Sequence, residues 1–135
     1  MKILVVDGQG GQLGGQVIKA LRSNVADAQI TAVGTNSTAT ATMMKAGADH
    51  AATGENPVVV ACRKADVIIG PIGIVIADAL YGEITPQMAV AVGQADALKI
   101  LLPVNKCDNL VAGVTDLPMA AIIDDAIAKV QKCCK

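Results

Sequence analysis

Residues 3–6 form a short run of isoleucine, leucine and valine, and a glycine-rich segment and an amphipathic helix pattern follow directly. A continuous apolar run of this length is typical of a strand buried on both faces in the middle of a parallel sheet. In the helix pattern, residues 12–22, Leu13, Val17 and Leu21 recur at helical spacing and form one apolar face. This order of strand, glycine loop and helix predicts a Rossmann-like α/β fold.

Strand and helix patterns alternate along the rest of the chain. Such alternation is typical of a three-layer sandwich, in which helices cover both faces of a mostly parallel sheet. We expect one Rossmann-like domain over residues 1–135, with about five or six strands. The first strand is expected in the middle, between those at 29–33 and 67–69. Further strands are expected at 49–52, 100–104 and 110–114. Further helices are expected at 37–46, 73–80, 86–94 and from an Asp116 cap onward, and residues 54–57 are expected to open a helical segment that runs through Arg63.

Composition narrows the classes of partner. The net charge is −1, there is no Trp or Phe, and there is a single Tyr. A nucleic-acid partner is therefore not expected, because such proteins usually have a basic face and stacking aromatics. The longest apolar stretch, residues 67–77, contains glycine and proline and falls short of the ~20 residues that a membrane helix needs. The four cysteines show no disulfide or metal-site spacing, and no leader pattern is visible, so we expect a cytoplasmic protein with reduced thiols and no metal.

The glycine-rich segment, residues 7–15, joins the first strand to the first helix. Gly8, Gly11 and Gly14 have a G-x-x-G-x-x-G spacing. The stricter G-x-G-x-x-G of dinucleotide-binding proteins does not fit, because Leu13 occupies its third glycine position. The segment is not a Walker A loop either, since no Gly-Lys-Ser/Thr follows.

The glycine spacing still suits a phosphate. Gly10 and Gly11 would let backbone N–H groups approach an anion, and Gly14 would let the helix lie close to the sheet. We therefore expect a phosphate-bearing ligand, or a sulfate mimic, against the N–H groups of residues 10–12. On this view Gly11→Val blocks binding and leaves the fold largely intact.

Two features argue against a simple dinucleotide site. Strand 29–33 is followed by glycine, threonine and asparagine, so the ribose-binding carboxylate expected there is missing. Thr35, Asn36 and Ser37 are candidates to contact a ribose or a 2′-phosphate instead. Asp7 places a negative charge beside the proposed phosphate; we expect it to cap the loop by accepting backbone N–H bonds, with a sugar hydroxyl or a metal-bridged phosphate as the alternative.

Two more loops are expected at the same edge of the sheet. Residues 70–73 would face the glycine loop if their strand neighbours the first strand, with a plain turn as the equal alternative. In the loop after residue 104, Lys106 is a candidate to neutralise a phosphate and Asn105 to bind a base or carbonyl, with a solvated connection about as well supported. The predicted ligand-binding residues are Asp7, Gly8, Gln9, Gly10, Gly11, Gln12, Gly14, Thr35, Asn36, Ser37, Gly70, Pro71, Gly73, Asn105 and Lys106.

No residue is assigned a catalytic role. Cys107 would need a neighbouring base, and the single histidine, His50, stands elsewhere in the chain. Tyr81 has no lysine four positions on, so the Tyr-x-x-x-Lys pair of short-chain dehydrogenases is missing. Glu55 and Glu83 stand beside turns, and either is a candidate base if it is buried.

We therefore predict a protein that binds a nucleotide, NAD(P) included, or another small phosphate-bearing ligand. One alternative is an NAD(P)-dependent oxidoreductase, which the missing ribose carboxylate and Tyr/Lys pair weaken. The other is a structural or regulatory interaction protein whose glycine turn is empty. The apolar helices expected at 73–80 and 86–94 also predict a homodimer or larger assembly, unless both helices are buried within one chain.

Several blocks of the chain, taken together, resemble a family of short bacterial proteins catalogued as a domain of unknown function. The resemblance covers nearly the whole length, implies a bacterial stand-alone domain and carries no catalytic role. The glycine loop is also similar to that of extended short-chain reductases, across the first βα unit only. The blocks that carry the family resemblance are residues 7–11, 34–37, 54–56, 70–73, 82–86 and 103–107.

Overall fold

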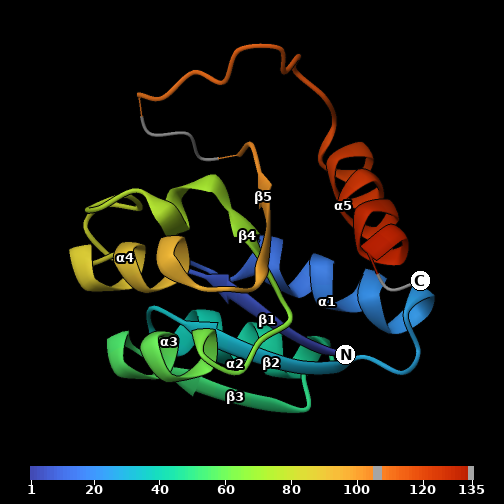
Figure 1. The fold of residues 1–135 in the computed structure, drawn as a ribbon, viewed down its shortest axis with the longest axis horizontal. Helices are drawn as coiled ribbons and strands as arrows, with labels where there is room; N and C mark the ends of the chain where they lie inside the picture. The colour runs from blue at the N-terminus through green and yellow to red at the C-terminus, as the bar shows by residue number, and fades with distance from the viewer. Residues whose placement is uncertain (105–107, 134–135) are drawn as a thin grey trace.

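The computed structural model describes residues 1–104 and 108–133. They form a mixed α/β fold in which helices cover both faces of a single five-stranded sheet, consistent with the expected Rossmann-like sandwich (Figure 1). Within these residues, no helix has both the length and the apolar character needed to cross a membrane.

The strands are all parallel and have the order β3-β2-β1-β4-β5. β1 (Lys2–Asp7) lies in the middle, paired with β2 (Gln29–Gly34) on one side and β4 (Val67–Pro71) on the other. β3 (His50–Thr53) and β5 (Leu98–Leu102) are the edges. The central position predicted for the first strand is confirmed.

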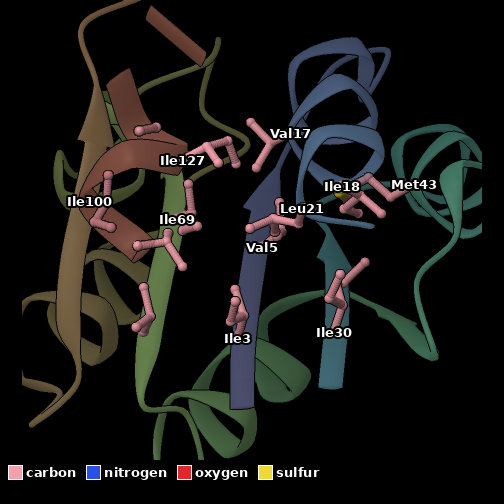
Figure 2. Packing of buried hydrophobic residues seen from close by; sticks show 14 of the residues in the cluster. Ile3, Val5, Val17, Ile18, Leu21, Ile30, Met43, Ile69, Ile100 and Ile127 are labelled. Carbon is pink, nitrogen blue, oxygen red and sulfur yellow. The ribbon is translucent and has the colours of Figure 1, made fainter. Parts of the chain in front are cut away.

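Alternate side chains of β1 point into two separate cores. Ile3 and Val5 pack with the helices of one layer, while Leu4 and Val6 pack with those of the other. Figure 2 shows the first core, where Val17 lies over the sheet near Val5. This period of two explains why the strand is apolar throughout: each face of a covered sheet needs its own apolar side chains. One layer contains α1 (Gln12–Asn24), α2 (Ser37–Ala46) and α5 (Met119–Cys133), and the other contains α3 (Glu55–Cys62), η1 (Ile72–Val75) and α4 (Pro86–Gln94).

The helix predicted at 73–80 is wrong. After the short 3₁₀ helix η1, the chain makes a series of turns in which Asp78, Leu80 and Tyr81 have left-handed φ values of 66°, 57° and 57°. The Asp78 amide donates to the Ile84 carbonyl at 2.7 Å and closes these turns into a loop. Ile74, Leu80 and Ile84 are all fully buried in the core beside α4. Tertiary burial of these side chains, rather than helix propensity, sets the conformation.

The strand predicted at 110–114 is also wrong, so the sheet does not gain a sixth strand from it. Leu110 is 94% exposed and Gly113 has φ 83° within a turn. Figure 1 shows this segment running away from the sheet on its way from β5 to α5. A strand forms backbone hydrogen bonds with a neighbouring strand, so an apolar run that lies away from the sheet edges does not become one.

Two boundaries move as well. β5 begins and ends two residues earlier than predicted. The last helix begins at Met119 and not after an Asp116 cap. Pro118 explains the later start, because a proline disfavours helical conformation in the residue before it, Leu117. The Pro118 carbonyl then accepts from the Ile122 amide at 3.2 Å as the first turn forms.

The apolar segments that predicted a homodimer are largely buried within one chain. Met88, Ala89 and Val92 of α4 lie in the core with Ile74 and Leu80. Val90 is the exposed large hydrophobic of this helix. These segments therefore need no partner to cover them, and the homodimer stays a prediction that light scattering over a concentration series tests.

Candidate functional site

The glycine loop, residues 8–11, lies where the direction of the sheet's winding reverses. α1 follows β1 on one face of the sheet, whereas η1 and α4 follow β4 on the other face. Ligands of open parallel sheets bind at this switch point, outside the carboxyl ends of the strands. The predicted contact loops after β1, β2 and β4 are thus brought to one edge.

The side chain of Asp7, at the carboxyl end of β1, accepts hydrogen bonds from the backbone of the glycine-rich segment. Its side chain is buried, with 4% of the residue's surface exposed. Oδ1 accepts from the Gly8 amide at 2.8 Å, and Oδ2 accepts from the Gly14 amide in the first turn of α1, also at 2.8 Å. The predicted role as a cap for the loop is confirmed, and both carboxylate oxygens are used within the protein.

The pKa of Asp7 is raised from its ordinary value of 3.8. Desolvation by burial is the largest cause; the amides of Gly8 and Gly14 oppose it, and the negative charge of Glu83 adds to it. The protein therefore holds a buried carboxyl group under the loop at some electrostatic cost.

Close contacts within the protein leave no room for a side chain at Gly11 or Gly14. Gly11 is the N-terminal cap of α1 with φ 74°, and a Cβ there would lie 2.7 Å from the backbone of Ala39. A Cβ at Gly14 would lie 2.5 Å from Met43 Sδ, so this glycine lets α1 approach α2 closely. Gly11→Val must therefore disturb the fold, and the expectation of a largely intact fold is revised.

Gly10 differs from these glycines. Its φ is not left-handed, and a Cβ would meet only Gln12 Cγ, at 4.0 Å. Gly10 and Gln12 are both exposed. Within the described residues, the N–H groups of Gly10, Gln12 and Leu13 have no hydrogen-bond acceptor, whereas the Gly11 amide donates to the Gly8 carbonyl at 2.9 Å. The open donors are thus two of the three that the sequence indicated, with Leu13 in addition.

Glu83 reaches the glycine loop from the turns between η1 and α4. Its Oε1 accepts from the Gln9 amide at 2.8 Å and from the Thr35 hydroxyl at 2.5 Å. The same oxygen accepts from Asn36 Nδ2 at 2.9 Å. A Cβ at Gly8 would lie 2.9 Å from Oε1, so this glycine leaves room for the carboxylate. One oxygen therefore joins the loops that follow β1 and β2 to the segment that follows β4.

The pKa of Glu83 is lowered from its ordinary value of 4.5. Partial desolvation acts to raise it, but the hydrogen bonds from Thr35, Gln9 and Asn36 together outweigh that effect. Glu83 is therefore an ionised carboxylate at neutral pH, held in place by three donors.

The predicted residues after β2 lie at this edge. Asn36 caps α2, with Oδ1 accepting from the Ala39 amide at 2.8 Å. Its Nδ2 also donates to the Gln9 carbonyl at 2.9 Å, which ties the cap to the glycine loop. Thr35 contributes its hydroxyl to Glu83, while Ser37 is exposed at the first position of α2.

The glycines within β4 and η1, Gly70 and Gly73, shape the edge without bonding to the loop. A Cβ at Gly70 would lie 2.4 Å from the Val6 carbonyl oxygen, so this glycine allows the close pairing of β4 with β1. Pro71 ends β4 and Gly73 lies in η1, and both are buried. Residues 70–73 were expected to face the glycine loop if their strand neighbours the first strand. The pairing of β4 with β1 confirms that strand position.

Some candidates lie elsewhere. Asn105, Lys106 and Cys107 fall outside the described residues. His50 begins β3 and is exposed at the opposite, amino edge of the sheet. Burial raises the pKa of the Cys62 thiol to about 11, which leaves it protonated and unsuited to act as a nucleophile at neutral pH.

The family model described as Domain of unknown function (DUF3842) matches residues 2–135. The chain belongs to this family. No curated protein and no solved structure matches it. The resemblance noted in the sequence is confirmed, and because the description of DUF3842 names no activity, the function has to be inferred from the site.

A cavity of about 410 Å³ lies away from the glycine loop of this DUF3842 chain, between α3 and residues of β1, β2 and β3. Its walls are mainly aliphatic, with Lys2, His50 and Lys64 among the lining residues. None of the loop residues or site carboxylates lines it. We place the candidate site at the carboxyl edge, where donors and acceptors converge, because ligand orientation depends on such polar groups.

Sequence reasoning missed the position of Glu83. The residue stood out only as a glutamate beside a turn, and its partners are 74, 48 and 47 positions away in the chain. The available signal was the missing carboxylate after β2, since an acid lost from one loop of a site can be supplied by another. Nothing in the local pattern identified which loop would supply it.

Proposed function

We propose that this protein binds a small phosphate-bearing ligand, with a nucleotide as the expected class, at the glycine loop. The carrying observation is the set of backbone N–H groups of Gly10, Gln12 and Leu13, which have no acceptor within the described chain. Free N–H groups at the start of a helix form an anion site, to which the positive end of the helix dipole adds.

The neighbouring carboxylates limit where the phosphate can lie. Glu83 already accepts from the Gln9 amide, and Asp7 already accepts from the Gly14 amide. The open donors lie between these two positions in the chain. A phosphate bound to them adds no competition for either carboxylate's hydrogen bonds.

The exposed backbone at Gly10 also supports the proposal. Neither φ nor packing inside the chain demands a glycine at this position. A side chain there would instead occupy the space through which a ligand approaches the N–H groups. The location at the switch point of a parallel sheet is where such ligands bind in open α/β folds.

The test is a titration of wild-type protein and two glycine variants with nucleoside mono- and diphosphates, NAD, NADP and inorganic pyrophosphate. Gly10→Val should weaken binding of the ligands that wild type takes by ~10-fold or more, equivalent to losing about 1.4 kcal/mol. Gly93→Ala is the matched control, because a Cβ at Gly93 meets nothing within 4 Å and the residue lies in α4.

Each alternative predicts a different result. Equal affinity in wild type and Gly10→Val contradicts the proposed position of the phosphate. A structural or regulatory protein with an empty loop predicts no binding in any variant. An NAD(P)-dependent oxidoreductase predicts a marked preference for dinucleotides, with hydride transfer to follow.

A further inference from the structure

Glu83 presents a half-used carboxylate at the carboxyl ends of β1 and β2. All three of its donors, the Gln9 amide, the Thr35 hydroxyl and Asn36 Nδ2, bond to Oε1. Among the described residues, Oε2 has no hydrogen-bond donor. A carboxylate oxygen has two lone pairs to offer, so Oε2 can accept from a bound molecule.

The backbone that carries Glu83 is held in an unusual shape. Asp78, Leu80 and Tyr81 have left-handed φ, and the turn closes with the Glu83 amide donating to the Leu80 carbonyl at 3.1 Å. Leu80 and Ile84, which enclose this stretch, are fully buried. The carboxylate is therefore positioned before any ligand arrives, and little side-chain entropy is lost on binding.

The position matches a need of the proposed ligand. The Glu83 carboxylate lies against Thr35, the residue directly after β2, where dinucleotide-binding folds place the carboxylate that binds a ribose. The same carboxylate accepts from the Gln9 amide, and the next residue in the chain is Gly10, whose open N–H is part of the proposed phosphate site. In a nucleotide the ribose is joined directly to the phosphate, and its hydroxyls are donors that suit an ionised acceptor.

We propose that Glu83, with Thr35 and Asn36 positioning it, accepts hydrogen bonds from the 2′- and 3′-hydroxyls of a ribose. The ligand is then a ribonucleotide with a free vicinal diol, selected over 2′-deoxy and 2′-phosphorylated counterparts. This inference rests on the proposed function, because it needs a phosphate on the neighbouring N–H groups.

The selection has a simple physical basis. A 2′-deoxyribose leaves one acceptor position of the carboxylate without its donor. A 2′-phosphate brings a negative charge against an ionised carboxylate, and no basic side chain among the described residues contacts that carboxylate to offset the repulsion. Discrimination should therefore act on the sugar and leave recognition of the phosphate itself unchanged.

The experiment measures affinities by calorimetry for the ribonucleoside 5′-diphosphates of adenine, guanine, cytosine and uracil, their 2′-deoxy counterparts and pyrophosphate. Wild type should prefer at least one ribonucleotide over its deoxy form by ~10-fold or more, as expected for a hydrogen bond to a charged group. Glu83→Gln should abolish most of that preference while pyrophosphate still binds, because the open N–H groups of the loop are unchanged.

Glu55→Gln is the matched control. Glu55 also accepts a threonine hydroxyl, from Thr85 at 2.5 Å, but has no bond to the glycine loop. This variant should keep the ribose preference of wild type. A loss of preference in both variants would assign the effect to general destabilisation and overturn the role of Glu83.

The other outcomes separate the two proposals. If wild type binds a ribonucleotide and its deoxy form equally, the diol inference is wrong and phosphate binding stands. If Glu83→Gln keeps the wild-type preference for the ribonucleotide over its deoxy form, Glu83 is a structural residue of the loop and not a sugar acceptor. If wild type binds none of the probes, the proposed function fails, and the diol inference fails with it.

Discussion

The backbone amide of Gln9 donates a hydrogen bond of 2.8 Å to Glu83 Oε1, although 74 positions separate the two residues in the chain. This bond places the Glu83 carboxylate near the carboxyl end of β1, where the carboxylate of Asp7 is buried. The two groups respond oppositely to their surroundings: burial raises the pKa of Asp7, while hydrogen bonds outweigh desolvation and lower the pKa of Glu83. Their contributions to stability should therefore depend on pH with opposite sign.

The loss of stability that Glu83→Gln causes should be smaller in acid than at neutral pH. Because the folded-state pKa of Glu83 lies below its ordinary 4.5, the ionised carboxylate stabilises the fold above that pH. The contribution is lost as pH falls through the lowered folded-state pKa. Urea unfolding of wild type and variant from pH 7 to pH 3 measures the difference in unfolding free energy, which should narrow below about pH 4.5. A difference that widens in acid contradicts the assignment.

Asp7→Asn should behave in the opposite way. Its amide group can accept from only one of the Gly8 and Gly14 amides, so the other loses its acceptor. Such an orphaned donor costs ~1–3 kcal/mol, and removal of a buried charge offsets part of this at neutral pH.

The pH dependence identifies the buried carboxyl group. Since the folded-state pKa of Asp7 exceeds 3.8, the folded protein takes up this proton before the unfolded chain does as pH falls. Wild type therefore gains stability relative to Asp7→Asn between the raised pKa and 3.8. The same urea series should show the gap widening over that interval, and a gap that stays constant with pH would count against the raised pKa.

Gly11→Ala should destabilise the protein by ~2–4 kcal/mol, from the left-handed conformation together with the clash. The Cβ would lie 2.7 Å from the Ala39 backbone, which cannot move aside as a side-chain end can. Gly10→Ala is the neighbouring control and should change stability by no more than ~0.5 kcal/mol, as at other unconstrained surface positions. Thermal unfolding of both variants decides the point, and similar melting temperatures for the two would contradict this account of the loop.

Asn36→Ala should cost ~1 kcal/mol through loss of the N-terminal cap of α2. It should also weaken any nucleotide binding, because Asn36 Nδ2 holds both the Gln9 carbonyl and the Glu83 carboxylate. Asn36→Asp keeps a capping oxygen but loses these donated bonds and places a negative charge beside Glu83. Restored stability with binding still impaired in Asn36→Asp would separate the cap from the site, whereas full recovery of binding would show that Nδ2 is dispensable.

Local sequence pattern determined the framework and the cap under the loop. The apolar runs at 3–6 and 67–69 predicted covered central strands, since only strands buried on both faces lack polar positions. Asp7 was predicted to cap the loop because its short side chain reaches backbone amides close by in the chain. These features depend on residues within a few positions of each other, which a single sequence displays.

Apolar segments without a clear helical or strand periodicity were assigned the wrong secondary structure. Residues 73–80 and 110–114 are both rich in aliphatic side chains, yet one forms buried turns and the other an exposed connection. Whether such a run is a helix, a strand or neither depends on which neighbouring surface is free to cover it. That information lies in the packing of η1, α4 and the sheet and not in the run itself.

The joining of Glu83 to the glycine loop was decided only by the tertiary structure. Left-handed conformations at Asp78, Leu80 and Tyr81 are unfavourable for these residues taken alone, so no local preference predicts them. They persist because Leu80 and Ile84 are buried in the core, and that burial outweighs the local cost. The sequence by itself thus determined that a loop with free backbone donors follows the first strand, while long-range packing determined which carboxylate lies beside it.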